Sequence, residues 1–494
     1  MKWLNSKLPI IVLGPVGMLA TGCVVGPDYE VHDLSSQTGE AWVESTTAIV
    51  EPIEDLSAWW ARFDDPEMAE MVRRSFEGSL TLADARERVV QARARRGIEN
   101  AARLPVLDAD AGYTYAESGR DSASFRGAPP GTSQDIYRVG VVAGWELDLW
   151  GRVARLVEAA EAEIDVAVED LRAARVALAA EVAREVVLIR ALDARLGVID
   201  RSIALREDSL EIAEARSRAR LVSELDALRA RRDLESDQAL VPDLRARRRA
   251  AELRLAVLLG QRPGSVTISP RALPRTPEIP ALGLPGDLVT RRPDIRRAER
   301  RLAAASARIG AARAERYPKL SVSGQFAFSA AQPGDLLTSA TRALSLGPTV
   351  TLPVLTGGRI DASVELAESQ TRSAMLQLEF IALRAVREVE TALSARARTA
   401  EQRTRLDSAA SAAVDAESLA SDLYAAGRTD FLDVLDAQRA VLSIEERLVL
   451  AREAELVQTI DLFTALGGGW SPPGKTLASD DVPRSTRERQ TKNY

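Results

Sequence analysis

The stretch 319–328 reads KLSVSGQFAF, and after a polar loop the stretch 344–352 reads LSLGPTVTL. In both runs every second residue is apolar or small, and most residues between them are small and polar. An alternation with a period of two is typical of paired β-strands that have one apolar and one polar face. The segment from Lys319 to Arg359 therefore predicts a β-hairpin whose polar face, built from small uncharged side chains, suits a water-filled lumen.

The same alternation occurs a second time, from Leu107 to Tyr115 and from Tyr137 to Leu147. The connecting loop, 118–136, is long, polar and rich in glycine and proline, as the long loops of outer-membrane strand pairs are. Four strands are too few to close a barrel. They therefore form a small sheet, or several chains pool their strands.

The rest of the chain has a helical pattern. No proline occurs between Arg152 and about Ser217, which predicts one long helix, and a turn near 220–224 sends the chain back. Pro242 is expected to break or kink the returning helix, and Gly260 is expected to cap its end. Six prolines between 261 and 286 then predict an extended linker.

The second half of the chain repeats the first. Gly97 and Pro105 recur 213 positions later as Gly310 and Pro318. A larger set of residues recurs with a shift of 207 positions. In the first half these are Gly140, Gly151, Arg152, Glu158, Glu161, Leu225, Asp226, Leu228, Ala230, Leu259 and Gly260. Their counterparts in the second half, in the same order, are Gly347, Gly358, Arg359, Glu365, Glu368, Leu432, Asp433, Leu435, Ala437, Leu466 and Gly467. So constant a shift predicts a duplicated unit of helix, hairpin and long helical hairpin.

Composition excludes several classes of function. The 494 residues carry a formal net charge of −7, so no basic surplus indicates a nucleic-acid partner. Cys23 is the only cysteine and His32 the only histidine, which excludes an intrachain disulfide and Cys/His zinc sites. Histidine-based nucleophilic catalysis would depend on His32 alone. We therefore expect no catalytic residues, no cofactor and no metal site.

Residues 1–22 have the pattern of a secretory signal peptide, with a basic start and an apolar run too short to span a bilayer. The run ends LATG immediately before Cys23, which resembles the lipobox of bacterial lipoproteins. We expect Cys23 to be lipidated and to become the mature N-terminus; an ordinary signal with an unmodified cysteine is the alternative. Val24, in place of aspartate, favours sorting to the outer membrane.

Residues 284–295 read LPGDLVTRRPDI. They resemble the LPxDLLxRRPDI signature of the TolC-like outer membrane factors, in the NodT/OprM branch, with Arg291, Arg292, Pro293 and Asp294 as its centre. On the residues alone, Pro293 and Asp294 also predict a helix start. The other segments that resemble this branch are 23–29, 59–66, 146–152, 424–427 and 432–438. The resemblance covers roughly residues 23 to 467.

The resemblance implies a mainly α fold with a transmembrane β-barrel contribution. Each chain would supply long helices and four β-strands, and a homotrimer would close a 12-stranded barrel in the outer membrane above a periplasmic α-helical barrel. The expected organisation is a signal peptide (1–22), a lipidated tether (23–57), a first repeat (58–260, with β-hairpin 106–148 and helical hairpin 152–260), a linker in an equatorial belt (261–286), a second repeat (287–467, with β-hairpin 319–355 and helical hairpin 359–466) and a polar tail (468–494).

The implied function is that of the passive exit duct of a tripartite efflux pump for drugs or other small toxic compounds. The implied partners are a periplasmic adaptor (membrane fusion) protein, an inner-membrane transporter of the resistance-nodulation-division (RND) type and outer-membrane lipid. Two alternatives stay open. A duct for type I protein secretion would share the fold, although the lipobox and the RRPD signature favour small-molecule efflux. A non-conducting periplasmic coiled-coil scaffold would not need the alternating hairpins.

The resemblance places a periplasmic gate at the turn 427–436. Asp433 and Asp436 match the aspartates that ring the tip in this family, and rings of negative charge admit cations. On the residues alone, the same acids stabilise a helix N-terminus. Tyr424 matches a tyrosine that helps to hold the tip closed, and Asp226, the repeat equivalent of Asp433, is its expected partner.

Two departures from the family pattern concern this gate. Thr429 stands where a relative has a gating arginine, with Arg428 beside it, and Arg220 stands where the second repeat has Gly427. The residues that latch the tip therefore differ from those of the relative.

Overall fold

The computed structural model describes residues 24–44, 55–117, 119 and 131–470. The predicted signal peptide, Cys23 and residues 471–494 of the predicted tail lie outside this range. Its helices and strands are α1 (Ser35–Thr38), η2 (Trp59–Phe63), α2 (Pro66–Gly78), α3 (Leu80–Ala101), β1 (Val106–Glu117), β2 (Ser133–Leu147), α4 (Arg152–Arg218), α5 (Glu224–Gln238), α6 (Leu240–Leu258), η3 (Pro285–Asp287), α7 (Leu288–Arg291), α8 (Pro293–Ala314), β3 (Lys319–Ala330), η4 (Pro333–Asp335), η5 (Ser339–Thr341), β4 (Arg342–Thr351), α9 (Arg359–Ala425) and α10 (Phe431–Ala465).

The chain divides into two compact units. The first contains the described residues of Met1–Val31, Gln91–Asp165 and Arg300–Leu376, and the second those of His32–Val90, Val166–Glu299 and Gln377–Tyr494. Among the described helices, none has the length and apolar composition that crossing a membrane requires.

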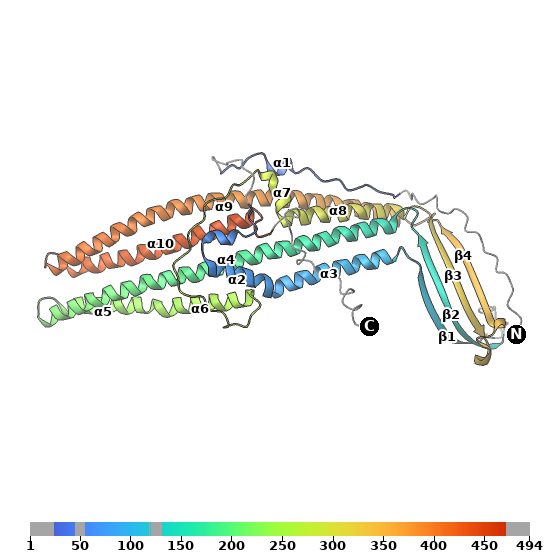
Figure 1. Cartoon of the computed structure of the whole chain (residues 1–494), viewed down its shortest axis with the longest axis horizontal. Helices are drawn as coiled ribbons and strands as arrows, with labels where there is room; N and C mark the ends of the chain where they lie inside the picture. Colours follow the sequence, from blue (N-terminus) through green and yellow to red (C-terminus); the bar gives the residue numbers. More distant parts are fainter. Residues whose placement is uncertain (1–23, 45–54, 118, 120–130, 471–494) are drawn as a thin grey trace. The chain divides into compact units, whose positions relative to one another are not determined.

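The first unit contains one antiparallel sheet with the strand order β1-β2-β3-β4 (Figure 1). Tyr113 lies opposite Tyr137 in the first hairpin, and Phe326 lies opposite Leu344 in the second. Within the described chain β1 and β4 each have a single neighbouring strand, so the sheet has two open edges. The prediction of a mainly helical fold with four paired strands is confirmed.

The segment 25–28, which follows Cys23 closely, is held in the first unit by close backbone contacts and by hydrogen bonds. A Cβ atom on Gly26 would lie 2.3 Å from the Cα of Gly310, so only two glycines allow this approach. The guanidinium of Arg155 donates to the carbonyls of Val25 and Gly26 and lies 2.8 Å from a carboxylate oxygen of Asp28. The described start of the tether is therefore fastened to the first turn of α4.

The duplication is visible in the element boundaries. α4 and α9 each contain 67 residues and begin 207 positions apart, at Arg152 and Arg359. α3 and α8 each contain 22 residues and begin 213 positions apart, at Leu80 and Pro293. β1 and β3 begin 213 positions apart, but β2 and β4 begin 209 positions apart, so the first hairpin has the longer connection between its strands.

The returning helix of the first repeat is broken three residues before the predicted position. α5 ends at Gln238 and α6 begins at Leu240, whereas α10 runs unbroken from Phe431 to Ala465. The physical cause is still Pro242, because a proline has no amide proton for the carbonyl four residues earlier and its ring clashes with that carbonyl. That carbonyl belongs to Gln238, the last residue of α5.

The aromatic residues of η2, at the start of the first repeat, are buried in the second unit. Trp59 is fully buried and stacks on Phe463 of α10, with ring centroids 5.5 Å apart. Asp65 caps α2 by accepting hydrogen bonds from the amides of Glu67 and Met68. The predicted tail starts too early, because Trp470 is also buried and its indole donates to the carbonyl of Arg291.

Candidate gate at the tips of the helical hairpins

The two long helical hairpins turn in the same way. At the end of α4 the amide of Leu221 donates to the carbonyl of Arg216 at 2.9 Å, and at the end of α9 the amide of Arg428 donates to the carbonyl of Leu423 at 2.8 Å. Such bonds, closing six residues, are typical of helix ends that finish with one residue in the left-handed conformation.

That left-handed residue is Arg220 in the first hairpin, with φ of 59°, and Gly427 in the second, with φ of 71°. Glycine adopts this conformation without a steric cost, whereas a residue with a Cβ atom loses roughly 1–2 kcal/mol. The departure noted in the sequence is therefore a point of backbone strain at the first tip.

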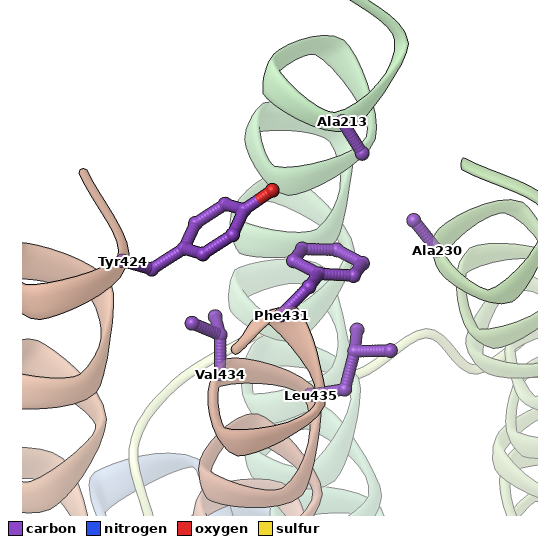
Figure 2. Close-up of a cluster of buried hydrophobic side chains, with 6 residues drawn as sticks. All are labelled: Ala213, Ala230, Tyr424, Phe431, Val434 and Leu435. Carbon is purple, nitrogen blue, oxygen red and sulfur yellow. The ribbon is translucent and has the colours of Figure 1, made fainter. Parts of the chain in front are cut away.

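A buried apolar cluster joins the tips of both hairpins (Figure 2). It consists of Ala213 from α4, Ala230 from α5, Tyr424 from α9, and Phe431, Val434 and Leu435 from α10. The rings of Tyr424 and Phe431 lie 5.1 Å apart, and Figure 2 shows the Tyr424 ring directed from α9 toward α4. Separating the hairpins would expose this cluster to water, which favours the packed arrangement.

Arg216, in the last turn of α4, reaches across to α9. Its guanidinium donates hydrogen bonds to the carbonyls of Tyr424 at 3.2 Å and Ala425 at 3.1 Å, and lies 4.4 Å from the centroid of the Tyr424 ring. Both carbonyls lie at the end of α9, where the helix dipole gives them partial negative charge. The carbonyl of Tyr424 also accepts a hydrogen bond from the amide of Gly427 at 2.9 Å. The one signal for this contact in the sequence is a basic residue in the last turn of a predicted helix.

Tyr424 does not form the expected pair with Asp226. The buried hydroxyl of Tyr424 has no hydrogen-bond partner in the described part of the chain. Asp226 instead lies 3.5 Å from Arg229 on its own helix. The tyrosine is held through its ring and its backbone carbonyl, which the family pattern does not predict.

The two predicted gate acids of α10 remain accessible. Asp433 and Asp436 are both exposed. Asp433 accepts a hydrogen bond from the hydroxyl of Thr429, so Thr429 fixes this carboxylate at the helix start. Asp433 and Asp436 thus lie on the solvent side of the tip, while Tyr424 belongs to its core.

A buried polar network lies further along the same helices. Arg206 of α4 contacts both Asp233 and Asp237 of α5, and Arg439 of α10 lies 2.7 Å from Asp233. Gln438 donates to the hydroxyl of Ser209 at 2.8 Å in a buried contact. Buried charges are costly to leave unpaired, so the ion pairs of Arg206 hold α4 against α5, and the bond from Gln438 to Ser209 links α10 to α4. No local pattern in the sequence predicts this network.

The RRPD signature has a structural role in the second unit. Arg292 donates a bidentate pair of hydrogen bonds to the carboxylate of Asp294, at 3.0 and 2.8 Å. It also donates hydrogen bonds to Glu388 of α9 and to the carbonyl of Ala465 at the end of α10. Burial raises the pKa of Asp294, but the hydrogen bond and charge of Arg292, the charge of Arg384 and the amide of Ile295 together lower it by more, so the net pKa lies below its ordinary value. Pro293 begins α8, as predicted.

Within the described residues, no group of three or more His, Cys, Asp or Glu side chains could hold a metal ion. The arrangement at the tips combines apolar packing, exposed acids and hydrogen bonds between the two hairpins.

Comparison with known proteins gives consistent matches along almost the whole chain. A family model described as "Outer membrane efflux protein" matches residues 72–261 and 284–468. Outer membrane protein OprJ of Pseudomonas aeruginosa is 31% identical over 465 residues, which cover 94% of this chain and 96% of that protein. The solvent efflux pump outer membrane protein SrpC of Pseudomonas putida is 32% identical over 481 residues, covering 94% and 98%.

A solved structure matches as well. The structure of the outer-membrane channel OprN is similar with a TM-score of 0.82 and 33% sequence identity, covering 91% of this chain and 100% of that one.

Proposed function

The chain belongs to the outer membrane efflux protein family, and we propose that three copies of it form the exit duct of a tripartite efflux pump. The family confirms the predictions of an outer-membrane location, of an efflux channel and of a chain that is not an enzyme. The trimer, the gate and the pump partners are our proposals.

The open sheet carries the trimer proposal. Leu344, Leu346 and Val350 of β4 are exposed, as are Leu107 and Tyr113 of β1. Lipid offers no hydrogen bonds to the free amides and carbonyls of a strand edge. Pairing β1 of one copy with β4 of the next would satisfy both edges, and three copies would close a sheet of twelve strands.

We propose that the tips of the helical hairpins form the periplasmic entrance. The apolar cluster around Tyr424 and the contacts of Arg216 would hold it closed, and Asp433 and Asp436 of three copies would surround the opening with negative charge. The accessibility of both acids supports this role.

The proposed organisation of the chain follows the repeat. In chain order, the proposed parts are the signal peptide (1–22), the tether (23–57), the first repeat (58–260), the linker (261–286), the second repeat (287–467) and the tail (468–494). The first residues of the tail, up to Trp470, pack in the second unit. We propose that Cys23 is lipidated. If Cys23 is the acylated residue, replacing it by Ser should abolish incorporation of labelled palmitate, although the chain still reaches the cell envelope. Continued incorporation of label in this variant would contradict the proposal.

The proposed partners are a periplasmic adaptor and an RND transporter, which would supply the energy. The name of the related SrpC, a solvent efflux pump component, supports small-molecule cargo rather than secreted protein.

The decisive experiment is native mass measurement on protein extracted by detergent from the outer membrane, followed by planar-bilayer recording. We expect three times the mass of one chain and discrete conductance steps. A monomer that is released without detergent and gives no conductance would contradict the proposal and favour a scaffold.

A further inference from the structure

A cavity of about 970 Å³ lies within the second unit, between the proline-rich linker and three helices. The linker residues 270–278 form one wall, and α4, α9 and α10 form the other. Its volume is in the range of small-molecule sites, about 300–1,000 Å³. None of the gate residues or the strands takes part in it.

The lining is strongly basic. Its arginines are Arg201, Arg271, Arg275, Arg396, Arg403 and Arg452, and its acids are Asp193, Glu278 and Glu455. The lining thus has three more positive than negative charges, in a chain whose overall net charge is −7. Random distribution of charge in an acidic protein would not favour such a concentration.

Two of the three acids already have cationic partners. Asp193 is bound by Arg248, which lies outside the lining, and Glu455 lies 2.8 Å from Arg403. Three of the lining arginines are paired as well, Arg201 with Glu445 and both Arg403 and Arg452 with Asp407. Among the described residues, the positive charge of the lining without a carboxylate partner is therefore that of Arg271, Arg275 and Arg396.

Arg396 is a half-buried cation that bonds to neutral groups. Its guanidinium donates to the carbonyl of Pro277 at 2.7 Å and to the hydroxyl of Thr459 at 3.1 Å. Burial lowers the pKa of Arg396, and the negative charge of Glu455 offsets only part of this effect. An anion in the cavity would compensate for the lost hydration of this guanidinium.

The linker side of the cavity holds two further cations. Arg271 and Arg275 are exposed, and neither has an ion pair or side-chain hydrogen bond with another described residue. Guanidinium groups bind carboxylates and phosphates through bidentate hydrogen bonds. The cavity therefore presents unengaged anion-binding groups on the linker wall and Arg396 on the helical wall.

We propose that this cavity binds a small molecule with two or more carboxylate or phosphate groups, which bridges the linker and the helices. One charged group would meet Arg271 and Arg275, and another would meet Arg396. Binding would fasten the linker to the helices and stabilise the folded protein by mass action. This site is separate from conduction, so it can be disproved while the proposed duct stands.

The test is isothermal titration of the detergent-solubilised full chain with citrate and, separately, with inorganic pyrophosphate. We expect at least one probe to bind, and acetate to bind at least tenfold more weakly. Binding of citrate alone would identify a carboxylate ligand and binding of pyrophosphate alone a phosphate ligand. Absence of binding by both probes, or acetate binding as tightly as the polyanions, would overturn the proposal.

Matched variants locate the site. The double substitution Arg271→Ala/Arg275→Ala removes no described contact, so the fold should persist, and affinity should fall at least tenfold, about 1.4 kcal/mol. The control, Arg245→Ala/Arg398→Ala, removes the same charge from exposed positions outside the cavity. Equal loss of affinity in both double variants would show only general attraction of anions and would refute the site.

Discussion

Replacement of Arg216 by Ala should loosen the closed tip. Arg216 is half-buried, and its two hydrogen bonds to the carbonyls of Tyr424 and Ala425 join α4 to α9. Hydrogen bonds to charged groups contribute about 1.5–3 kcal/mol when shielded, so we assign about 1 kcal/mol to each of these partly solvated ones. The position over the Tyr424 ring adds about 0.5 kcal/mol.

The summed loss is about 2.5 kcal/mol, which corresponds to an increase of about 60-fold in the ratio of open to closed channels if opening breaks all three contacts. Single-channel recording in planar bilayers measures this ratio directly. The matched control is Arg218→Ala, because Arg218 lies in the same helical turn and is 70% exposed. Among the described residues it pairs only with Glu214 of its own helix, at 3.6 Å. Equal open probability in the Arg216 and Arg218 variants would refute the latch.

Tyr424→Phe separates this latch from the one that the family pattern predicts. The hydroxyl of Tyr424 is buried without a partner among the described residues, and its removal leaves the ring and the carbonyl that Arg216 contacts. Because an unsatisfied buried hydroxyl is unfavourable, the closed state should be as stable as before or more stable. A rise in open probability would instead indicate a hydrogen bond from Tyr424 to Asp226.

Three further predictions follow from the tips and the signature. Replacing Asp433 and Asp436 by Ala should raise conductance and weaken block by multivalent cations, and unchanged block in bilayers would contradict their role. Arg220→Gly should stabilise the protein by roughly 0.5–1 kcal/mol, because the relief of roughly 1–2 kcal/mol of left-handed strain exceeds the entropy cost of glycine, roughly 0.5–1 kcal/mol. A lowered thermal midpoint would contradict this prediction. Because the pKa of Asp294 is lowered in the fold, its stabilisation is present above the unfolded pKa of about 3.9 and is lost as the pH falls through the folded value. Thermal midpoints measured downward from pH 5 should therefore decline more steeply for the native protein than for Asp294→Asn.

The strands and long helices could be predicted because their signals are local. The alternation in 319–328 has a period that only a strand provides, and it recurs in the first repeat. Helix ends followed from proline and glycine, as at Gly260, which adopts φ of 68° after α6. Even the break at Gln238 has a local cause, displaced only because a proline acts on the carbonyl four residues earlier.

The latch could not be predicted in the same way, because it joins residues far apart in the chain. Arg216 and Tyr424 are separated by 208 positions, and no local pattern reports that pair. The resemblance supplied a tyrosine and an aspartate but not their geometry. Tyr424 lies in the apolar cluster of the tip, and its hydroxyl forms no hydrogen bond with Asp226 within the described chain.

The residues that join the two tips are not repeated within the duplication. The repeat shift of 207 places Leu423 opposite the position of Arg216, and Ser217 opposite that of Tyr424. The contact therefore has no counterpart in the opposite direction. The first tip donates through the guanidinium of Arg216, and the second tip accepts through the Tyr424 ring and two helix-end carbonyls. The strained residue Arg220 lies in the donor turn and the relaxed Gly427 in the acceptor turn, so the strain is confined to the hairpin that carries the latch.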